Sequence, residues 1–367
     1  MKFQIDKHVL VKPLNQVSKA LPGRTTIEIL NGILFEVNEK GLSLTAGDSA
    51  TSIMATISPD DFQLEQHGAI VLPGKKIVDI VTKAPEDISF EINGLQVTVR
   101  SGKSKFEMTG LDAEEYPAFD YGSGTEITVP GETLRSMINK TIFATSKKEE
   151  TPILTGINFK FEEGKLILTG TNRHRLARSA ENIENDSVFS VVIKSDSLAE
   201  LLKLIDAKEE AKISFNGHKF VVKTSDFTFG SSILEGSFPD VDRIIPNDFN
   251  SVVTVNTSKL LGSLERVLIV AAEEKTNQIL ITVGEEVQID SKTGSGFNAS
   301  ESLEIKEKKG PDFRFAVNAK YVHEALKTVE SEEVSIHFIQ DLSPIIFKGS
   351  QENDDLQLIL PYRTGVQ

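Results

Sequence analysis

The sequence predicts an α+β fold made of three similar units in tandem, each with two helices packed on antiparallel sheets. Three observations predict it: similar segments recur every 122 to 126 residues, six stretches have helical apolar periodicity, and short alternating runs with glycine turns separate them. Strand runs interrupted by single helices are typical of α+β domains, and a fixed internal period indicates a repeated structural unit. We expect domains at residues 1–122, 123–248 and 249–367.

The repeat is clearest in the first two thirds of the chain. The segment ILNGI at residues 29–33 aligns with ILTGI at 153–157, a shift of 124 residues. Residues 94–97 align with 217–220, and residues 116–120 with 238–242, at shifts of 123 and 122. In the last third, segments 278–281 and 343–347 fall about where the pattern would recur. Concordant offsets favour a true repeat over chance similarity between amphipathic strands.

Six segments carry apolar residues at the spacing of a helix face, two in each unit. They are residues 6–20, 75–83, 132–145, 198–205, 257–267 and 322–329. Thr257 or Ser258 is expected to cap the fifth helix in sequence order. Between the helices, ISFEINGLQVTVRSG and AKISFNGHKFVVKTSD alternate with period two. They predict hairpins that turn at Asn93-Gly94 and Asn216-Gly217.

Charge is distributed unevenly along the chain. The 367 residues include 40 Lys and Arg against 54 Asp and Glu, a net charge of −14. Taken alone, that balance argues against a nucleic-acid binder. Counted with their flanking residues, over 6–20, 75–83, 132–148, 195–208, 258–275 and 319–327, the six helical segments nevertheless carry +7, which leaves −21 for the rest. If the helices share one surface, that surface is basic inside an acidic shell, although ordinary solvated helix faces would give the same count.

Composition narrows the class of protein. The chain has no Cys, which excludes disulfides, thiolate nucleophiles and iron–sulfur ligands and favours a reducing compartment. No apolar run approaches the ~20 residues that cross a bilayer, and the N-terminal residues lack the apolar core of a signal peptide. We therefore expect a cytoplasmic protein.

The search for chemistry finds no catalytic constellation and no metal-ligand spacing among the six His residues. The one dense polar cluster is TNRHRLA at residues 171–177, after an apolar strand. A binding or structural turn is favoured, since no neighbour would orient His174 or act as a nucleophile. The alternatives are a nucleotide or phosphoester hydrolase that uses His174 with Asp48 or Asp240, and a sequence-specific DNA regulator. The sequence has no recognisable helix-turn-helix, which argues against a regulator. We expect no cofactor and no metal.

Several strings, in order, carry a resemblance to a known family: MKF at the start, LNQVS and PGR before residue 25, the TNRHRLA cluster, FPD with RIIP at 238–246, and LILPYR at 358–363. On these the chain resembles the bacterial DNA polymerase III beta subunit, the DNA sliding clamp, over its whole length. The resemblance implies a ring-forming head-to-tail homodimer that encircles duplex DNA without reading its sequence. It implies a processivity factor rather than an enzyme.

The resemblance also implies partners and site residues. The partners would be the polymerase III alpha subunit, the clamp loader, other polymerases and repair proteins, which insert short peptides with Gln and Leu or Phe anchors. The implied peptide pocket comprises Leu154, Thr171, His174, Arg175, Leu176, Pro239, Ile244, Leu358, Leu360, Pro361, Tyr362 and Arg363. The implied DNA contacts are Arg24, Lys75, Lys76 and Lys148. The implied dimer interface joins Lys103, Lys105, Phe106 and Met108 to Ile269, Val270, Glu301 and Glu304.

The chain departs from the family pattern at several of these places. Ser195-Asp196 and Thr151-Pro152 stand where basic or aromatic residues are usual, and Asn277 stands where an Arg is expected. Arg173 replaces a small residue before His174, and the tail extends by residues 364–367. These departures leave the ring intact but make individual DNA contacts uncertain.

Overall fold

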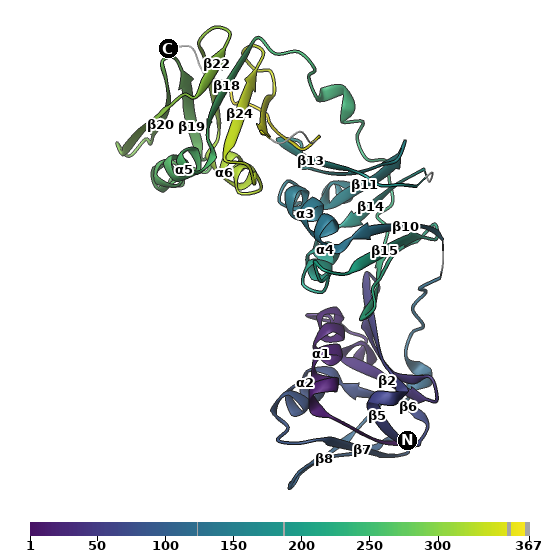
Figure 1. Ribbon diagram of the computed structural model, residues 1–367. Helices are drawn as coiled ribbons and strands as arrows, with labels where there is room; N and C mark the ends of the chain where they lie inside the picture. The colour runs from purple at the N-terminus through teal and green to yellow at the C-terminus, as the bar shows by residue number, and fades with distance from the viewer. Residues whose placement is uncertain (123, 186–187, 351–353, 364–367) are drawn as a thin grey trace. The chain divides into compact units, whose positions relative to one another are not determined.

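The computed structural model describes residues 1–122, 124–185, 188–350 and 354–363 (Figure 1), so the tail extension at 364–367 lies outside the described residues. Two compact units make up the chain. Unit 1 comprises Met1–Leu134 and Asp196–Ile233, and unit 2 comprises Arg135–Ser195 and Leu234–Gln367. The middle third of the sequence therefore contributes to both units.

Every predicted helix is present. The helices are α1 (Lys7–Val17), α2 (Gly74–Lys83), α3 (Gly131–Ile142), α4 (Ser195–Leu202), α5 (Thr257–Ala271) and α6 (Ala319–Leu326). The prediction that Thr257 or Ser258 caps α5 is wrong. The Asn256 side chain instead accepts the N–H of Lys259 at 3.0 Å, and Thr257 is already the first helical residue. Asn is a strong N-cap because its side-chain oxygen satisfies a free donor of the first turn.

In unit 1 the strands form two antiparallel sheets. The five-stranded sheet has the order β5 (Phe62–Gln66), β1 (Lys2–Ile5), β7 (Ile88–Asn93), β8 (Gln96–Ser101) and β9 (Ser104–Thr109). The eight-stranded sheet has the order β10 (Thr125–Pro130), β15 (Glu210–Phe215), β16 (Lys219–Lys223), β17 (Phe227–Ser232), β4 (Thr51–Ile57), β3 (Gly41–Gly47), β2 (Gly32–Asn38) and β6 (Gly68–Pro73). Because β17 pairs with β4, this sheet joins the middle third of the sequence to the first.

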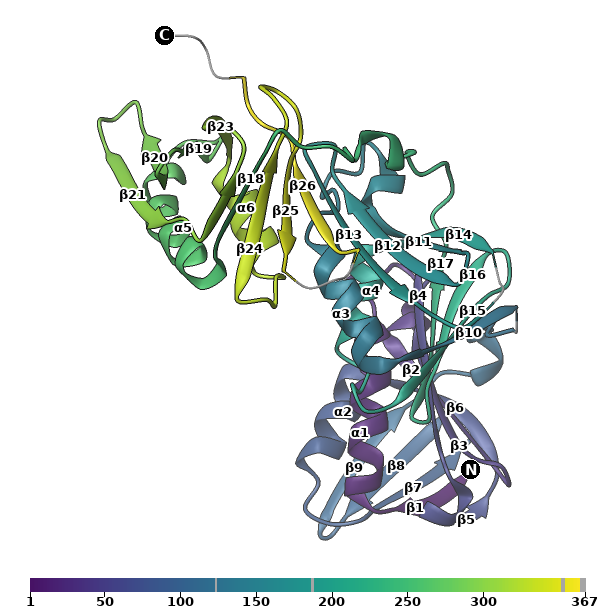
Figure 2. The same cartoon turned by 45° about the horizontal axis from the view of Figure 1, so that its top comes forward.

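In unit 2 the strands again form two antiparallel sheets. The nine-stranded sheet has the order β14 (Phe189–Lys194), β11 (Gly156–Glu162), β12 (Lys165–Thr171), β13 (Arg175–Asn182), β26 (Leu356–Ile359), β25 (Ile345–Gly349), β24 (Glu333–Phe338), β18 (Ser251–Asn256) and β22 (Glu307–Lys309). The four-stranded sheet has the order β21 (Asn298–Glu304), β20 (Glu286–Lys292), β19 (Gln278–Val283) and β23 (Phe313–Asn318). The pairing of β13 with β26 joins the middle third to the last (Figure 2).

The hairpin between β7 and β8 turns one residue later than predicted. Asn93 pairs with Gln96, which leaves Gly94 and Leu95 as the two turn residues. Gly94 has a φ of +59°, a left-handed conformation that glycine adopts at little cost. The hairpin between β15 and β16 has the same arrangement, because the N–H of Asn216 donates to the carbonyl of Lys219 and leaves Gly217 and His218 as the central turn residues. Gly217 has a φ of +91°.

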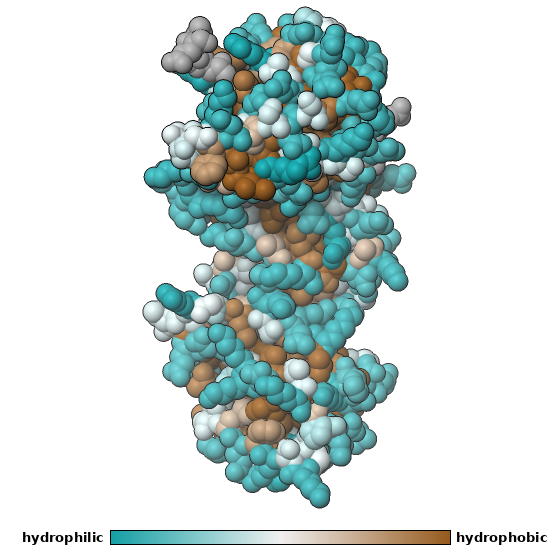
Figure 3. All heavy atoms as spheres, turned by 90° about the vertical axis from the view of Figure 1, so that its left-hand side faces the viewer, coloured by the Kyte–Doolittle hydropathy of each residue, from teal (hydrophilic) through white to brown (hydrophobic). Residues whose placement is uncertain are grey.

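Each unit has a closely packed core. In unit 1 the buried rings of Phe3 and Phe90 stack with centroids 4.7 Å apart. In unit 2, α5 and α6 lie side by side and bury Leu260, Leu264 and Val322 against the sheets. The face drawn in Figure 3 is mainly hydrophilic, with separate hydrophobic patches. Within the described chain, no helix is both long and apolar enough to cross a membrane.

Candidate partner-binding site

The TNRHRLA cluster forms the tight turn between β12 and β13. Its geometry is fixed by Asn172, whose side-chain oxygen accepts the N–H groups of His174 and Arg175 at 3.0 and 3.1 Å. The hydroxyl of Thr171 donates to the carbonyl of Arg175 at 2.7 Å. Arg173 occupies the tip with a φ of +74°, a conformation that is strained for a residue with a side chain. Glycine would adopt this conformation at little cost.

A strand from the far end of the sequence completes this site. Leu176 pairs with Leu358, and just beyond the strand the N–H of Leu360 donates to the carbonyl of His174 at 2.9 Å. Leu176 and Leu358 are 2% and 1% exposed and pack with Ile346 and Leu356 in a small apolar cluster. Leu154 is also buried. These leucines are therefore the floor of the site rather than its surface.

Two branched aliphatic side chains of the predicted set stay accessible. Leu360 is 40% exposed and Ile244 is 49% exposed. Around them the partly buried Val241, Ile245 and Phe249 pack against the cluster below. Ile244 is the sequence neighbour of Ile245, and Leu360 lies two residues after Leu358. We name the set of Ile244, Leu360, Leu176 and Leu358 the apolar slot. The sequence reasoning missed Val241, Ile245 and Phe249, although their apolar character beside the Phe238-Pro239 motif was a usable signal.

Arg175 has a different environment from the one the sequence suggested. Its side chain is buried, and its guanidinium donates to the carboxylate of Glu324 and the carbonyl of Phe143. The guanidinium carbon lies 4.4 Å from the ring centroid of Tyr321 and 5.1 Å from that of Phe143. Such stacking is a favourable cation–π arrangement. Arg175 therefore ties β13 to α6, and the exposed donors at the rim are His174 and Arg363.

Tyr362 and Pro239 have separate surroundings. The hydroxyl of Tyr362 donates to the carbonyl of Thr276 at 2.9 Å and accepts from Asn318, so the tail is held against the last third. Pro239 lines a separate groove with Arg178 and Asp242. Leu154, His174 and Arg175 line a cleft of about 600 Å³ together with Tyr321. The predicted pocket residues thus fall into three adjoining surfaces.

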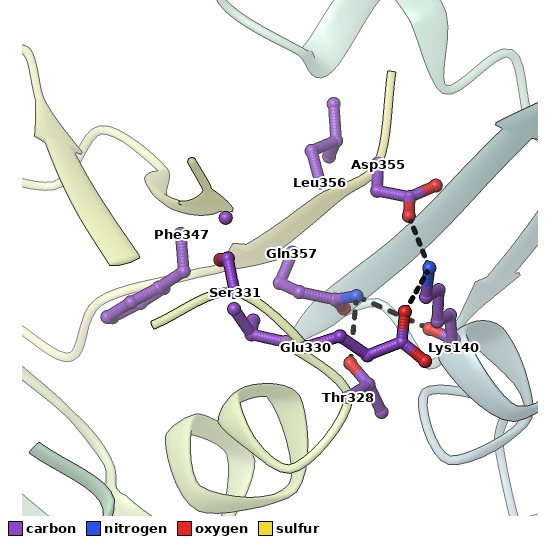
Figure 4. A pocket seen from close by; sticks show the side chains of 10 residues that line it. Lys140, Thr328, Glu330, Ser331, Phe347, Asp355, Leu356 and Gln357 are labelled. Atoms are coloured by element: carbon purple, nitrogen blue, oxygen red, sulfur yellow. Dashed lines mark hydrogen bonds and ion pairs between the residues drawn. The ribbon is translucent and has the colours of Figure 1, made fainter. Parts of the chain in front are cut away.

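An ion pair joins α3 to the residue just before β26 within unit 2. The ammonium of Lys140 on α3 contacts Asp355 at 2.9 Å and Glu330 at 3.4 Å (Figure 4). Asp355 also accepts the hydroxyl of Ser179 at 2.7 Å. Burial lowers the pKa of Lys140, but the hydrogen bond and charge of Asp355 outweigh it, and the net pKa is raised. Lys140 was counted as a surface charge from the sequence, but it is an internal one.

The four predicted DNA contacts are all exposed. Arg24, Lys75 and Lys76 lie in unit 1 and Lys148 in unit 2, and in the described chain none of them forms an ion pair. Other helix lysines are engaged: Lys12 pairs with Asp226. Part of the positive charge counted on the helices is therefore neutralised by carboxylates of the same chain.

The two predicted interface strands are both sheet edges. β9 is the last strand of the five-stranded sheet and β21 the first of the four-stranded sheet. Phe106 on β9 is 38% exposed and Ile269 on α5 is 74% exposed. Exposed edge strands with apolar side chains are templates for pairing with another chain.

The hydrolase alternative has little geometric basis. His174 and Asp240 line different hollows, and Asp48 accepts the N–H groups of Ala50 and Thr51 in its own turn. Among the described residues, no group of three or more His, Asp or Glu side chains is placed to hold a metal ion.

Comparison with known proteins identifies the class. Family models of the DNA polymerase III beta subunit match three consecutive parts of the chain: the N-terminal domain at residues 1–120, the central domain at 128–240 and the C-terminal domain at 242–363. The beta sliding clamps of Bacillus subtilis and Staphylococcus aureus are 34% and 32% identical to it, over 99% of this chain and 100% of each relative.

Solved structures agree. The DNA polymerase sliding clamp from Bacillus subtilis superposes with a TM-score of 0.96 at 32% identity and covers 100% of both chains. The beta subunit from Streptococcus pyogenes gives 0.95 at 27% identity, over 99% of this chain and 100% of that one.

The fold and the site define a non-catalytic processivity factor built from three α+β domains. The chain belongs to the DNA polymerase III beta subunit family, the bacterial DNA sliding clamps. The predicted fold class and the predicted lack of an enzymatic activity are confirmed by this membership, and the hydrolase alternative finds no support in any relative.

Proposed function

We propose that two copies of this chain close head to tail into a cytoplasmic ring around duplex DNA. The ring would hold the polymerase III alpha subunit, the clamp loader and other polymerases and repair proteins through short peptides. Family membership supports the proposal. We retain domain bounds of 1–122, 123–248 and 249–367 for the three repeats.

Ring closure would pair β9 of one copy with β21 of the other. Within one chain Lys105 contacts Glu107 at 2.5 Å and Arg266 contacts Glu301 at 2.6 Å. These ion pairs would have to break before Lys105 and Glu301 could form the expected charge pairs between the two copies. Exposed ion pairs contribute little either way. Closure would therefore depend on strand pairing and on Phe106 and Met108 packing against Ile269 and Val270, with Lys103 and Glu304 at the periphery.

DNA would be held by non-specific phosphate contacts. Arg24, Lys75, Lys76 and Lys148 are exposed and available to neutralise phosphates. Phosphate contacts carry no sequence information, and that is compatible with sliding. The test of enclosure is retention: rings loaded on circular plasmid should survive salt that abolishes phosphate contacts, and should leave once the plasmid is cut. Equal loss from both forms would exclude enclosure.

The partner peptide would bind at the apolar slot. The observation that carries this proposal is the exposure of Ile244 and Leu360 in segments that also supply the buried apolar cluster, through Ile245 and Leu358. An accessible apolar surface beside fixed polar groups is the usual form of a peptide anchor site. Thr171, Pro361 and Tyr362 would shape the walls, and His174 and Arg363 would supply donors to the peptide. Burial of one Leu or Phe anchor is worth about 1.5–3 kcal/mol, which suits an exchangeable contact.

The experiment is a titration of a labelled QLxLF-type peptide. Ile244→Ala with Leu360→Ala should weaken binding at least about tenfold, since two apolar contacts are truncated. The matched control is Ile27→Ala, which removes a side chain of similar exposure (57%) in unit 1. Deletion of residues 360–367 is a harsher test, because it also removes the Tyr362 hydrogen bonds. Unchanged affinity in a folded, dimeric double variant would place the pocket elsewhere.

A further inference from the structure

The cleft beside the apolar slot is strongly basic in an acidic protein. It holds about 600 Å³ between the end of α3, the β12–β13 turn and the start of α6. Its charged lining residues are Lys147, Lys148, Arg173, Arg175, Lys275 and Lys320, against Glu150 and Glu324. The lining thus carries +4, whereas the whole chain carries −14.

Most of that positive charge is not neutralised by the protein. Glu324 is used by the buried Arg175. The remaining lysines of the cleft are exposed, and none of them forms an ion pair with any residue that the structure describes; they are Lys147, Lys148, Lys275 and Lys320. Like charges that converge on one concavity repel one another and raise the local concentration of anions. The cleft is therefore complementary to an anionic ligand.

The position of the cleft indicates which anion it takes. Its turn residue His174 accepts the N–H of Leu360, so the cleft and the apolar slot share one hydrogen-bonded boundary. Its lining includes the apolar side chain of Leu154 and the ring of Tyr321. A concavity of this size accommodates a few side chains, and it is too small for a duplex. A peptide anchored on Leu360 would have its flanking residues at this mouth.

We infer that the cleft takes the acidic flank of a partner peptide, so that this chain selects partners with Asp or Glu beside their apolar anchors. The inference rests on the proposed function. The guanidinium of Arg173 donates to Thr151 at 2.8 Å, and both residues line the cleft, so Arg173 contributes a preoriented charge. The lysines act through long-range attraction, and the apolar slot supplies the main affinity.

The experiment compares two labelled peptides on the intact dimer: a QLxLF-type peptide with neutral flanks, and the same peptide with two Asp or Glu residues on each flank. The cleft variant is Lys148→Gln with Lys275→Gln and Lys320→Gln. The matched control is Lys40→Gln with Lys208→Gln and Lys292→Gln, which removes the same charge from exposed positions outside the cleft. A single-stranded oligonucleotide is titrated in parallel.

We expect the acidic peptide to bind the unchanged protein about five- to tenfold more tightly than the neutral one, with the advantage lost in high salt. The cleft variant should lose that advantage and keep its affinity for the neutral peptide, and the control variant should keep both. Equal affinity for the two peptides, or equal loss in both variants, overturns the inference and leaves the apolar slot intact. If the cleft variant loses oligonucleotide binding but keeps its affinity for both peptides, the inference is overturned in favour of a nucleic-acid ligand. Failure of the neutral peptide to bind would instead refute the proposed pocket, and the inference with it.

Discussion

The ammonium group of Lys140 lies 2.9 Å from the carboxylate of Asp355, although 215 residues separate them in the sequence. The two side chains are only 10% and 14% exposed. A charge pair so far removed from solvent stabilises the fold only while both partners are present. The contact therefore ties α3 to β26, the strand that pairs with β13 at the candidate partner-binding site.

Lys140→Met should destabilise unit 2 by about 3 kcal/mol, because it leaves the Asp355 carboxylate buried without its cation. The midpoint of urea unfolding measures the effect. Lys140→Met combined with Asp355→Leu should recover much of the loss, since no charge then stays buried. A single variant within about 0.5 kcal/mol of the unchanged protein would contradict this account.

Stability should depend on the ionisation of Glu181 near the same pair. Burial, and then the charge of Asp355, raise the pKa of Glu181 above its ordinary value. Glu181 therefore holds its proton more tightly in the folded protein than in the unfolded chain. As pH rises from the ordinary pKa near 4.5 toward the raised pKa, ionisation of Glu181 lowers the stability of the folded state. Glu181→Gln should therefore raise stability at pH 7 by up to about 0.5 kcal/mol. The difference from the unchanged protein should shrink below pH 4.5. Melting curves across that range measure it, and a constant difference would count against the assignment.

The pKa of Lys140 itself is raised, so its charge stabilises the fold at neutral pH and ceases to do so at high pH. A lysine with a raised pKa stabilises the fold fully below its ordinary value near 10.5, and that stabilisation is lost as pH rises through the raised value. The unchanged protein should therefore lose stability above pH 10.5 more steeply than Lys140→Met does. Unfolding midpoints at pH 9 and pH 11 test this, and parallel losses would exclude it.

Arg175→Lys should cost about 2–3 kcal/mol although the charge is kept. Lysine cannot donate to Glu324 and Phe143 at once while stacking on Tyr321. Arg363→Lys, at an exposed position, is the control and should change stability by less than about 0.5 kcal/mol. Denaturant midpoints compare the two. Equal effects would mean that Arg175 acts only through its charge.

Arg173→Gly should relieve backbone strain at the tip of the TNRHRLA turn. The substitution also removes the hydrogen bond to Thr151, so it is best made in a Thr151→Val background, where that bond is already absent. There it should stabilise the protein by roughly 1 kcal/mol, the cost of a left-handed residue with a side chain. Thermal melting is the readout, and destabilisation in that background would show that the turn is not strained.

Phe106→Ala with Ile269→Ala should yield folded monomers if β9 and β21 close the ring. The control is Ile27→Ala with Leu342→Ala, two exposed apolar residues on neither edge strand. Light scattering after size exclusion gives the mass of each. A persistent dimer with native melting in the first variant would refute the assigned interface.

Local patterns were sufficient for the helices and insufficient for the sheets. All six helices follow from apolar spacing within a dozen residues. The pairings of β17 with β4 and of β13 with β26 could not be read from the sequence, because strand register depends on partners far along the chain. The position of the α5 cap was missed because Asn256, Thr257 and Ser258 are all plausible caps.

The sequence indicated which segments meet at the candidate site, but not which of their side chains are buried. Leu176 and Leu358 lie opposite each other on paired strands, yet both are buried. Arg175 carries no sequence signal that distinguishes a rim donor from an internal tie, since Phe143, Tyr321 and Glu324 reach it from distant segments. For the same reason Lys140 counts as surface charge until its distant partner Asp355 is known.

The pairing of β13 with β26 has a consequence for biosynthesis. The two strands are about 180 residues apart, so a ribosome finishes the TNRHRLA turn long before it makes Leu358 and Leu360. Until then β13 has an unpaired edge and the apolar slot lacks one wall. If the proposed pocket is the partner site, a nascent or truncated chain that lacks Leu358 and Leu360 cannot recruit a partner there.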